Sequence, residues 1–228
     1  MSQKLKCLLI SGLFLMSQMV IGQKSETGNW IAYFGNQGLS KKWNVWNEVQ
    51  YRNYNFAGDL QQLLIRVGVG YNLTENNNNL HMGYGFIRSR NYLSDNVTTL
   101  SNTEHRIYQQ FITRQSFGRV HLQHRFRLEE RFIADNVSVR FRYLVGVNIP
   151  FNRPKMEKGA VYFSAYNEIF INRKSPKYDR NRIYGGLGYV FNTNIRAELA
   201  MMAQTLENKN RNQFQMLLFY NLPFKSKE

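Results

Sequence analysis

Apolar and polar residues alternate with a period of two through most of the chain. Within residues 139–149, for example, Phe141 and Tyr143 alternate with Arg140 and Arg142. Such alternation is typical of a β-strand that has one apolar and one polar face. The same pattern predicts ten strands, near residues 43–52, 62–72, 80–86, 104–114, 120–132, 139–149, 161–171, 180–189, 194–201 and 211–222.

The segments that link the predicted strands alternate between short and longer polar ones. The short links lie at residues 116–118 and 192–194, and the longer ones at residues 89–103, 172–179 and 206–210. Short turns on one side and longer loops on the other are typical of outer-membrane barrels. We therefore predict an all-β fold, an antiparallel transmembrane β-barrel.

Large aromatic residues recur at the short-turn end of successive predicted hairpins. By parity, each of them lies on the apolar face of its strand, which a membrane barrel turns outward. A ring of aromatic side chains is expected where such a barrel meets the membrane interface. The predicted aromatic girdle consists of Trp43, Tyr71, Phe117, Phe151, Phe191 and Phe224.

Residues 29–38 complicate the strand count. They contain the apolar run 30–34, which resembles one more strand and would bring the total to eleven. With both chain ends in the periplasm, the number of strands should be even. We therefore expect ten strands, with residues 29–38 packed inside or along the barrel. The alternative is twelve strands, with the missing one within residues 89–103.

The first residues have the layout of a cleaved secretory signal peptide. Lys4 and Lys6 precede a largely apolar run at residues 7–21, after which the chain becomes polar. This run is too short and ends too abruptly for a membrane-spanning helix. We predict a signal peptide at residues 1–23 and an outer-membrane β-barrel domain at residues 24–228, exported through the periplasm to a bacterial outer membrane.

The chain is strongly basic, with 30 Lys and Arg residues against 15 Asp and Glu residues. Such a surplus favours anionic partners, and for an exported protein we expect lipid phosphates and no nucleic acid. The predicted partners are outer-membrane lipid and the phosphates of lipopolysaccharide, for which the basic loop 173–177 with Arg180 is the candidate contact. A solvated loop without a partner is the alternative. The barrel-assembly machinery is a further expected partner, because the last strand ends on Phe224 like an assembly signal, although residues 225–228 follow it.

The polar faces of the predicted strands carry many charged side chains, which a membrane barrel would turn into its lumen. Arginine stays charged and forms two-bond pairs with carboxylates. Barrels of about eight strands are filled by their own side chains, so a ten-stranded lumen crowded with arginine is expected to be closed or nearly so. The alternative is a narrow anion-preferring pore, because rings of arginine select anions. The predicted lumen charge network consists of Glu48, Arg52, Arg66, Glu104, Arg106, Arg114, Arg125, Arg127, Glu129, Arg131, Arg140, Arg142, Glu168, Arg182, Arg196 and Glu198.

The sequence contains no convincing catalytic or metal-binding motif. Removal of the signal removes Cys7, the single cysteine, so a disulfide framework or a cysteine ligand is excluded from the mature chain. His81, His105, His121 and His124 have no Ser or Asp beside them at a spacing that marks a nucleophile and its base. The pair His121/His124 would lie on opposite faces of one strand and cannot share an ion. We expect no catalytic residue, no metal and no cofactor; a barrel hydrolase acting on lipid or peptide, with a triad assembled across strands, is the third alternative.

Several arginine-rich segments resemble a known family. They read EHRIYQQ at residues 104–110, HRFRLEERF at 124–132, RFRY at 140–143, NE at 167–168, DRNR at 179–182 and RAE at 196–198. They are similar to a bacterial outer-membrane β-barrel family that is catalogued as domain of unknown function 2490. The resemblance implies a barrel that covers most of the mature chain and has no assigned activity.

Overall fold

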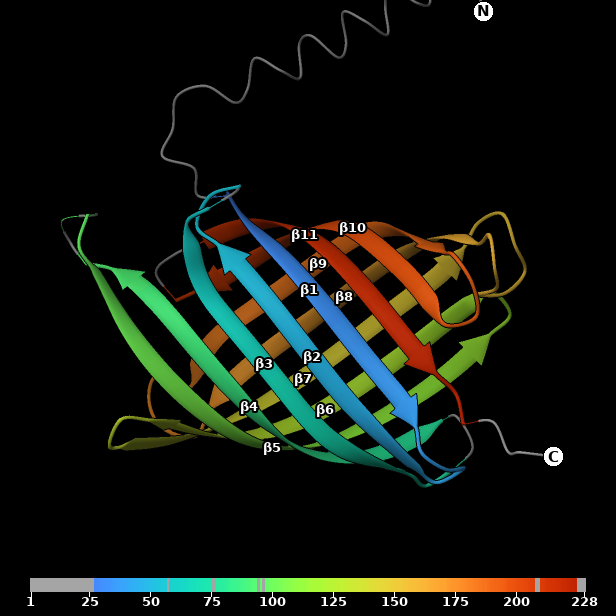
Figure 1. The fold of residues 1–228 in the computed structure, drawn as a ribbon, viewed down its shortest axis with the longest axis horizontal. Helices are drawn as coiled ribbons and strands as arrows, with labels where there is room; N and C mark the ends of the chain where they lie inside the picture. The colour runs from blue at the N-terminus through green and yellow to red at the C-terminus, as the bar shows by residue number, and fades with distance from the viewer. Residues whose placement is uncertain are drawn as a thin grey trace, which may run out of the picture.

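The computed structural model describes residues 27–224, except residues 57, 75, 76, 94, 96, 208 and 209. The strands close into a single barrel, as Figure 1 shows. They are β1 (Thr27–Gly38), β2 (Trp43–Asn53), β3 (Leu60–Asn72), β4 (Asn78–Tyr92), β5 (Thr99–Phe117), β6 (Val120–Ile133), β7 (Asn136–Pro150), β8 (Val161–Asn172), β9 (Tyr178–Val190), β10 (Ile195–Leu206) and β11 (Asn210–Leu222). The predicted all-β barrel is therefore confirmed.

The barrel closes between its first and last strands, β1 and β11. These two strands pair in parallel, from Thr27 opposite Asn212 to Gln37 opposite Leu222, whereas all other neighbouring strands are antiparallel. An up-and-down barrel with an odd number of strands must contain one parallel pair, because its first and last strands run in the same direction. The predictions of ten or twelve strands and of a wholly antiparallel sheet are therefore wrong. Residues 29–38 lie neither inside nor along the barrel but form most of an eleventh strand in its wall.

The barrel has two distinct ends. One end lies at the left of Figure 1, and we call it the hairpin end because the long β4–β5 hairpin projects there. It carries the links at residues 54–59, 93–98, 134–135, 173–177 and 207–209. The other end, which we call the girdle end because the predicted aromatic girdle lies there, carries the links at residues 39–42, 73–77, 118–119, 151–160 and 191–194. The longest link, 151–160, and one of the two shortest, 118–119, thus share the girdle end. The predicted division into a short-turn end and a long-loop end is wrong.

Most of the predicted loop 89–103 belongs to two long strands. β4 extends to Tyr92 and β5 begins at Thr99, and their pairing continues to the end of both strands. This hairpin projects beyond its neighbours at the left of Figure 1. Its outer part lacks apolar alternation because a ladder that extends past the barrel needs no apolar face. The twelfth strand that we considered within residues 89–103 is therefore an extension of β4 and β5.

Side chains on the two faces of the barrel wall differ sharply. Outward positions such as Ile65, Val67 and Val69 are exposed and apolar, whereas the inward side chain of Arg66 between them is buried. Inside, most charged residues come from β5 to β9. An apolar cluster lies on the side of the lumen that β1, β9, β10 and β11 form. It consists of Trp30, Ala32, Tyr184, Ala200, Met202 and Leu217.

The predicted signal peptide at residues 1–23 lies outside the described residues. In the part of the chain that the structure describes, no helix is long and apolar enough to cross a membrane.

Candidate functional site: the barrel lumen

A buried carboxylate on β6, Glu129, lies at the centre of the lumen charges. Its side chain is 0% exposed. Its oxygens lie 2.6 Å from Arg142 Nη1, 2.7 Å from Arg140 Nη2, 3.4 Å from Arg127 Nη1 and 3.9 Å from Arg106 Nη1. Since a buried charge is tolerated only when it is paired and hydrogen-bonded, these four arginines, from β5, β6 and β7, account for the burial of Glu129.

A second carboxylate, Glu168 on β8, extends the network along the wall to the next strand. Its Oε1 accepts hydrogen bonds from Arg142 Nη2 at 2.6 Å and from Arg125 Nη2 at 2.8 Å. Arg182 on β9 lies 3.8 Å from its other oxygen. Arg142 thus bridges Glu129 and Glu168 and joins β6, β7 and β8 through side chains.

Two further acids complete the network towards the hairpin end. Glu104 pairs with Arg106 at 2.6 Å and with Arg131 at 2.5 Å. Asp179 pairs with Arg140 at 2.6 Å and with Arg180 at 3.1 Å.

Asp179 and Arg180 belong to the network but were not among the predicted lumen residues. The register between β8 and β9 shifts at Phe170 and Ile171, so that Arg180 opposes Phe170 and Tyr178 opposes Ile171. Asp179 is therefore the extra residue of an irregularity, where simple parity does not apply. The nearest signal in the sequence was the acid next to two arginines in the segment DRNR.

An aromatic ring lies among the arginines of the network. Phe170 is 1% exposed. The guanidinium carbons of Arg142, Arg182, Arg140 and Arg180 lie 4.3, 4.7, 5.1 and 5.8 Å from its centroid. Because cations are attracted to the face of an aromatic ring, Phe170 helps to hold these like charges together.

The remaining predicted lumen residues also face inward but stay outside this network. Glu48 and Arg66 form a separate pair at 2.6 Å. Glu198 accepts hydrogen bonds from the hydroxyls of Tyr162 and Tyr184. The other three contact neutral groups: Arg52 lies over the ring of Trp30, Arg196 lies over the ring of Phe219, and Arg114 donates to Gln123.

Beside the network, the lumen contains a cavity of about 560 Å³. One wall is aromatic and comes from β1, β2 and β11. Phe34 stacks on Phe219 with ring centroids 5.0 Å apart and lies 6.0 Å from the ring of Trp46. Trp30 continues the same wall.

The opposite wall of the cavity is polar and basic. It includes Arg114 from β5 and His121, Gln123 and Arg125 from β6. In the ring of strands, β6 lies on the side opposite to β1. The cavity therefore has an aromatic side and a cationic side.

Ser116 and His121 meet at the girdle end of the lumen. They are direct cross-strand partners on β5 and β6, and Ser116 Oγ lies 2.9 Å from His121 Nδ1. This pair was not predicted from the sequence, although a two-residue turn at 118–119 is sufficient to predict it. Among the described residues, His121 forms no hydrogen bond with a carboxylate, and no group of three His, Cys, Asp or Glu residues is arranged to hold a metal ion.

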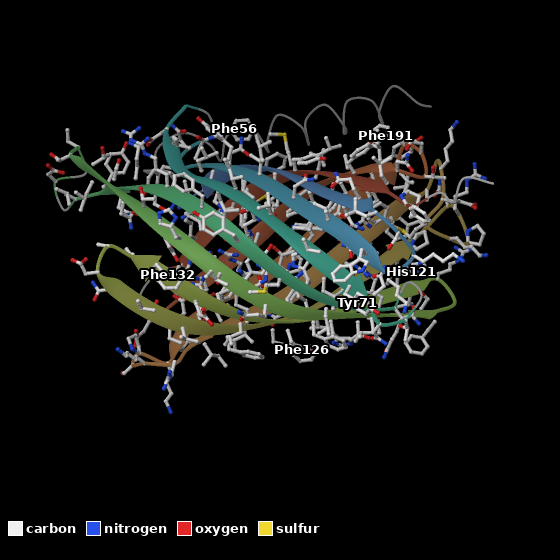
Figure 2. All side chains as sticks on the ribbon, turned by 60° about the horizontal axis from the view of Figure 1, so that its bottom comes forward. Phe56, Tyr71, His121, Phe126, Phe132 and Phe191 are labelled. Atoms are coloured by element: carbon white, nitrogen blue, oxygen red, sulfur yellow. The ribbon has the colours of Figure 1, made fainter. Side chains whose placement is uncertain are left out.

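The residues of the predicted girdle all lie at the girdle end. Trp43, Phe117, Phe151, Phe191 and Phe224 are exposed and Tyr71 is half-buried. Aromatic residues also lie at the hairpin end, where no girdle was predicted. Figure 2 shows Tyr71 and Phe191 towards one end of the barrel and Phe56 and Phe132 towards the other.

No curated protein matches the chain. The solved structures that resemble it include an in-vitro folded OmpT, an outer membrane protein of Vibrio cholerae, with 16% identity over 74% of this chain and 52% of that one, and a TM-score of 0.39. A trimer form of the same protein gives 15% identity, coverage of 75% and 61%, and a TM-score of 0.38. The chain thus spans less than two thirds of either OmpT chain, and similarity at this level says nothing about its activity.

A family model described as "Protein of unknown function (DUF2490)" matches residues 27–215. This match covers the barrel from β1 into β11, including the whole charge network. The resemblance seen in the arginine-rich segments is therefore confirmed: the chain belongs to the DUF2490 family of proteins of unknown function.

Proposed function

We propose that the protein is a non-enzymatic barrel of the bacterial outer membrane whose lumen is closed to ions by its own charged side chains. The observation that carries this proposal is the fully buried Glu129, paired with arginines from three strands. These side chains project from three neighbouring strands and fill that side of the lumen, which leaves less room for a continuous file of water. The role that follows is structural or related to the envelope.

The outer wall supports a location in a membrane. Its exposed side chains include many large apolar residues, among them Val67, Leu128, Ile183 and Leu199. Soluble monomers rarely expose apolar patches larger than a few hundred Å². Outer-membrane lipid would cover this surface after the barrel-assembly machinery has inserted the chain.

The loop 173–177 at the hairpin end supports a contact with lipopolysaccharide phosphates. Arg173, Lys174 and Lys177 are exposed there. Arg180, in contrast, is paired with Asp179 and is less free to bind a phosphate. Near an anionic membrane each free cation contributes on the order of 1 kcal/mol.

Recordings of the purified protein in planar lipid bilayers test the closed lumen. We expect no steady conductance from the unaltered protein. We expect conductance steps from the double variant Arg140→Ala, Arg142→Ala, which removes two of the four arginines that contact Glu129. The control is Arg88→Ala, an exposed, outward-facing arginine of β4. Steady anion-selective steps from the unaltered protein that disappear in Arg127→Ala would contradict the proposal and favour the narrow anion pore.

The pore is the second candidate because the cavity reaches the girdle end with cations at its mouth. Arg114 is exposed there, and neither Arg114 nor Arg196 forms an ion pair within the described residues. The bilayer experiment above separates the two candidates.

The contact between Ser116 and His121 keeps a hydrolase as a third candidate. Labelling with a fluorophosphonate tests it, since such a reagent modifies only an activated serine. We expect no labelling of Ser116. The matched serine is Ser164, which lines the cavity; selective labelling of Ser116 that is lost in His121→Ala would support the hydrolase instead.

A further inference from the structure

The lumen cavity contains more hydrogen-bond donors than its own acceptors satisfy. Arg66 and Trp30 line it and are 5% and 4% exposed. Nε and Nη1 of Arg66 and Nε1 of Trp30 have no hydrogen-bond partner in the described structure, and the same is true of Nε of Arg125 and Nε of Arg196. Every one of these atoms is a donor. Buried donors without partners are costly, so a molecule rich in acceptors would stabilise the lining once these side chains turn towards it.

The charges around the cavity also favour a ligand that is rich in acceptors. Its lining carries seven arginines, Arg66, Arg114, Arg125, Arg127, Arg142, Arg182 and Arg196, against three carboxylates, Glu48, Glu168 and Glu198. Two of the carboxylates are already paired with arginine, and Glu198 is held by two tyrosine hydroxyls. Glu129, which lies outside the lining, pairs with Arg127 and Arg142. Arg114 and Arg196 have no carboxylate partner among the described residues, and a bound anion would neutralise part of their charge.

The aromatic wall of the cavity favours a ligand that also has an apolar part. Phe34, Trp46 and Phe219 present ring surface to the cavity across from Arg125. Arg196 lies 4.3 Å from the ring centroid of Phe219, which brings a cation next to the apolar surface. A hydrated inorganic anion would leave this wall without a partner, whereas a flat apolar group would pack against it.

From these three observations we propose that the cavity binds an organic anion with a flat apolar body. Its carboxylate or similar group accepts from Arg125 and its neighbours, and its body lies against Phe34, Trp46 and Phe219. The volume of about 560 Å³ suits one small molecule, since ligand pockets measure roughly 300–1,000 Å³. The inference goes beyond the proposed function, because neither the location of the barrel nor its conductance bears on the binding.

Binding of naphthalene-2-carboxylate to the protein in lipid nanodiscs tests the proposal. Trp30 and Trp46 line the cavity, so their fluorescence in a Trp43→Phe background reports occupancy. We expect saturable binding, and binding at least about tenfold weaker for the neutral naphthalene-2-carboxamide, because a hydrogen bond to a charged group is worth more than one to a neutral group. Inorganic phosphate should bind more weakly as well, since it lacks the apolar body. Empty nanodiscs correct for partition into lipid.

Two arginines of β6 provide a matched pair of variants. The side chains of Arg125 and Arg131 are 20% and 18% exposed, and each pairs with one glutamate. Only Arg125 lines the cavity. We expect Arg125→Gln to weaken binding of the naphthoate by about tenfold or more and Arg131→Gln to leave it within about twofold.

The outcomes separate cleanly. Absence of saturable naphthoate binding overturns the proposal, and equal losses in Arg125→Gln and Arg131→Gln overturn it too. If the amide binds as tightly as the naphthoate, the cavity does not recognise the negative charge. If phosphate binds as tightly as the naphthoate, the apolar body contributes nothing to binding. If Arg125→Gln does not fold, Arg114→Gln at the exposed mouth of the cavity replaces it, with the same expected weakening.

Discussion

At the residue scale, Glu129 resolves a conflict between like charges. Arg127 and Arg142 are direct cross-strand partners on β6 and β7, an arrangement that is destabilising by itself. Both guanidinium groups contact Glu129 Oε1, at 3.4 and 2.6 Å. The carboxylate therefore allows the two arginines to face each other in the lumen.

Replacing Glu129 by Gln leaves its four arginines without their shared counter-charge. We expect the free energy of unfolding to fall by roughly 3–5 kcal/mol, the usual cost of breaking a buried ion pair by removing one partner. Denaturant unfolding in lipid vesicles, followed by tryptophan fluorescence, measures the change.

The neighbouring Glu130 provides the control. It faces outward on the same strand, where it opposes Ile107 and Val139. Glu130→Gln should leave the free energy of unfolding unchanged or raise it, because a charge next to lipid is unfavourable. Equal losses in the two variants would mean that the network around Glu129 contributes nothing specific.

Asp95 at the tip of the β4–β5 hairpin provides a pH-dependent test outside the barrel wall. Its carboxylate accepts hydrogen bonds from the Thr98 hydroxyl at 2.5 Å and from the N–H groups of Thr98 and Val97 at 2.9 and 3.0 Å. These bonds, led by the one from the hydroxyl, lower the pKa of Asp95 below its ordinary value. A lowered pKa in the folded state means that the turn is stabilised above the ordinary pKa and that this stabilisation is lost as the pH falls through the folded-state pKa.

The substitution Thr98→Val removes the hydroxyl but keeps the backbone donor. We expect the pKa of Asp95 to rise towards its ordinary value, as measured by an NMR titration of the carboxyl carbon. Thr103→Val, at an outward position on β5 away from the turn, should leave the pKa of Asp95 unchanged. An unaltered pKa in Thr98→Val would contradict the assigned cause.

At the element scale, β1 decides how the barrel closes. Its inward residues Trp30, Ala32 and Phe34 lie level with inward residues of both β2 and β11. They also contribute to the apolar cluster in the lumen. A ten-stranded barrel would pair β2 directly with β11 and leave these side chains without a place in the wall.

Cysteine pairs distinguish the two closures. Tyr33 is the partner of Leu218 across β1 and β11, and of Val49 across β1 and β2. In a Cys7→Ser background we expect Tyr33→Cys with Leu218→Cys to form a disulfide, since neighbouring strands bring Cα atoms within the range of about 4.4–6.8 Å that a disulfide needs. Val49→Cys with Leu218→Cys should not, because β1 lies between them. Gel mobility before and after reduction gives the answer, and the reverse result would restore a ten-stranded barrel.

At the scale of the whole molecule, the polar residues of the outer wall support contact with lipid. Several of them pair with one another, as expected where no water is available to satisfy them. The pairs are Asn47 with Gln37 at 2.9 Å, Asn167 with Asn181 at 2.8 Å, Tyr84 with His105 at 2.5 Å and His124 with Tyr143 at 2.9 Å. The odd strand number, in contrast, departs from the even numbers of single-chain bacterial outer-membrane barrels.

The three tryptophans test the membrane orientation of the wall. Trp43 is exposed in the girdle, whereas Trp30 and Trp46 line the lumen cavity. In vesicles with brominated lipid chains we expect the fluorescence of Trp43, measured in Trp30→Phe with Trp46→Phe, to be strongly quenched. Trp43→Phe, which keeps the two inner tryptophans, should show little quenching, and equal quenching in both would contradict a lipid-facing exterior.

The sequence by itself determined which side chains face each way. Glu48, Arg66, Arg127 and Glu168 were assigned to the inner face from alternation alone, and they are buried. This succeeds because the period of two is a local property of an extended backbone and needs no knowledge of neighbouring strands. The ten strands from β2 to β11 were found for the same reason.

Only the tertiary structure decided how many strands close the ring, which arginine meets which carboxylate, and where space is left. The partners of Glu129, the inward turn of Asp179 and the cavity between Phe219 and Arg125 depend on register, on one irregularity and on closure of the first strand against the last. These are relations between residues far apart in the chain. Alternation along a single strand does not contain them.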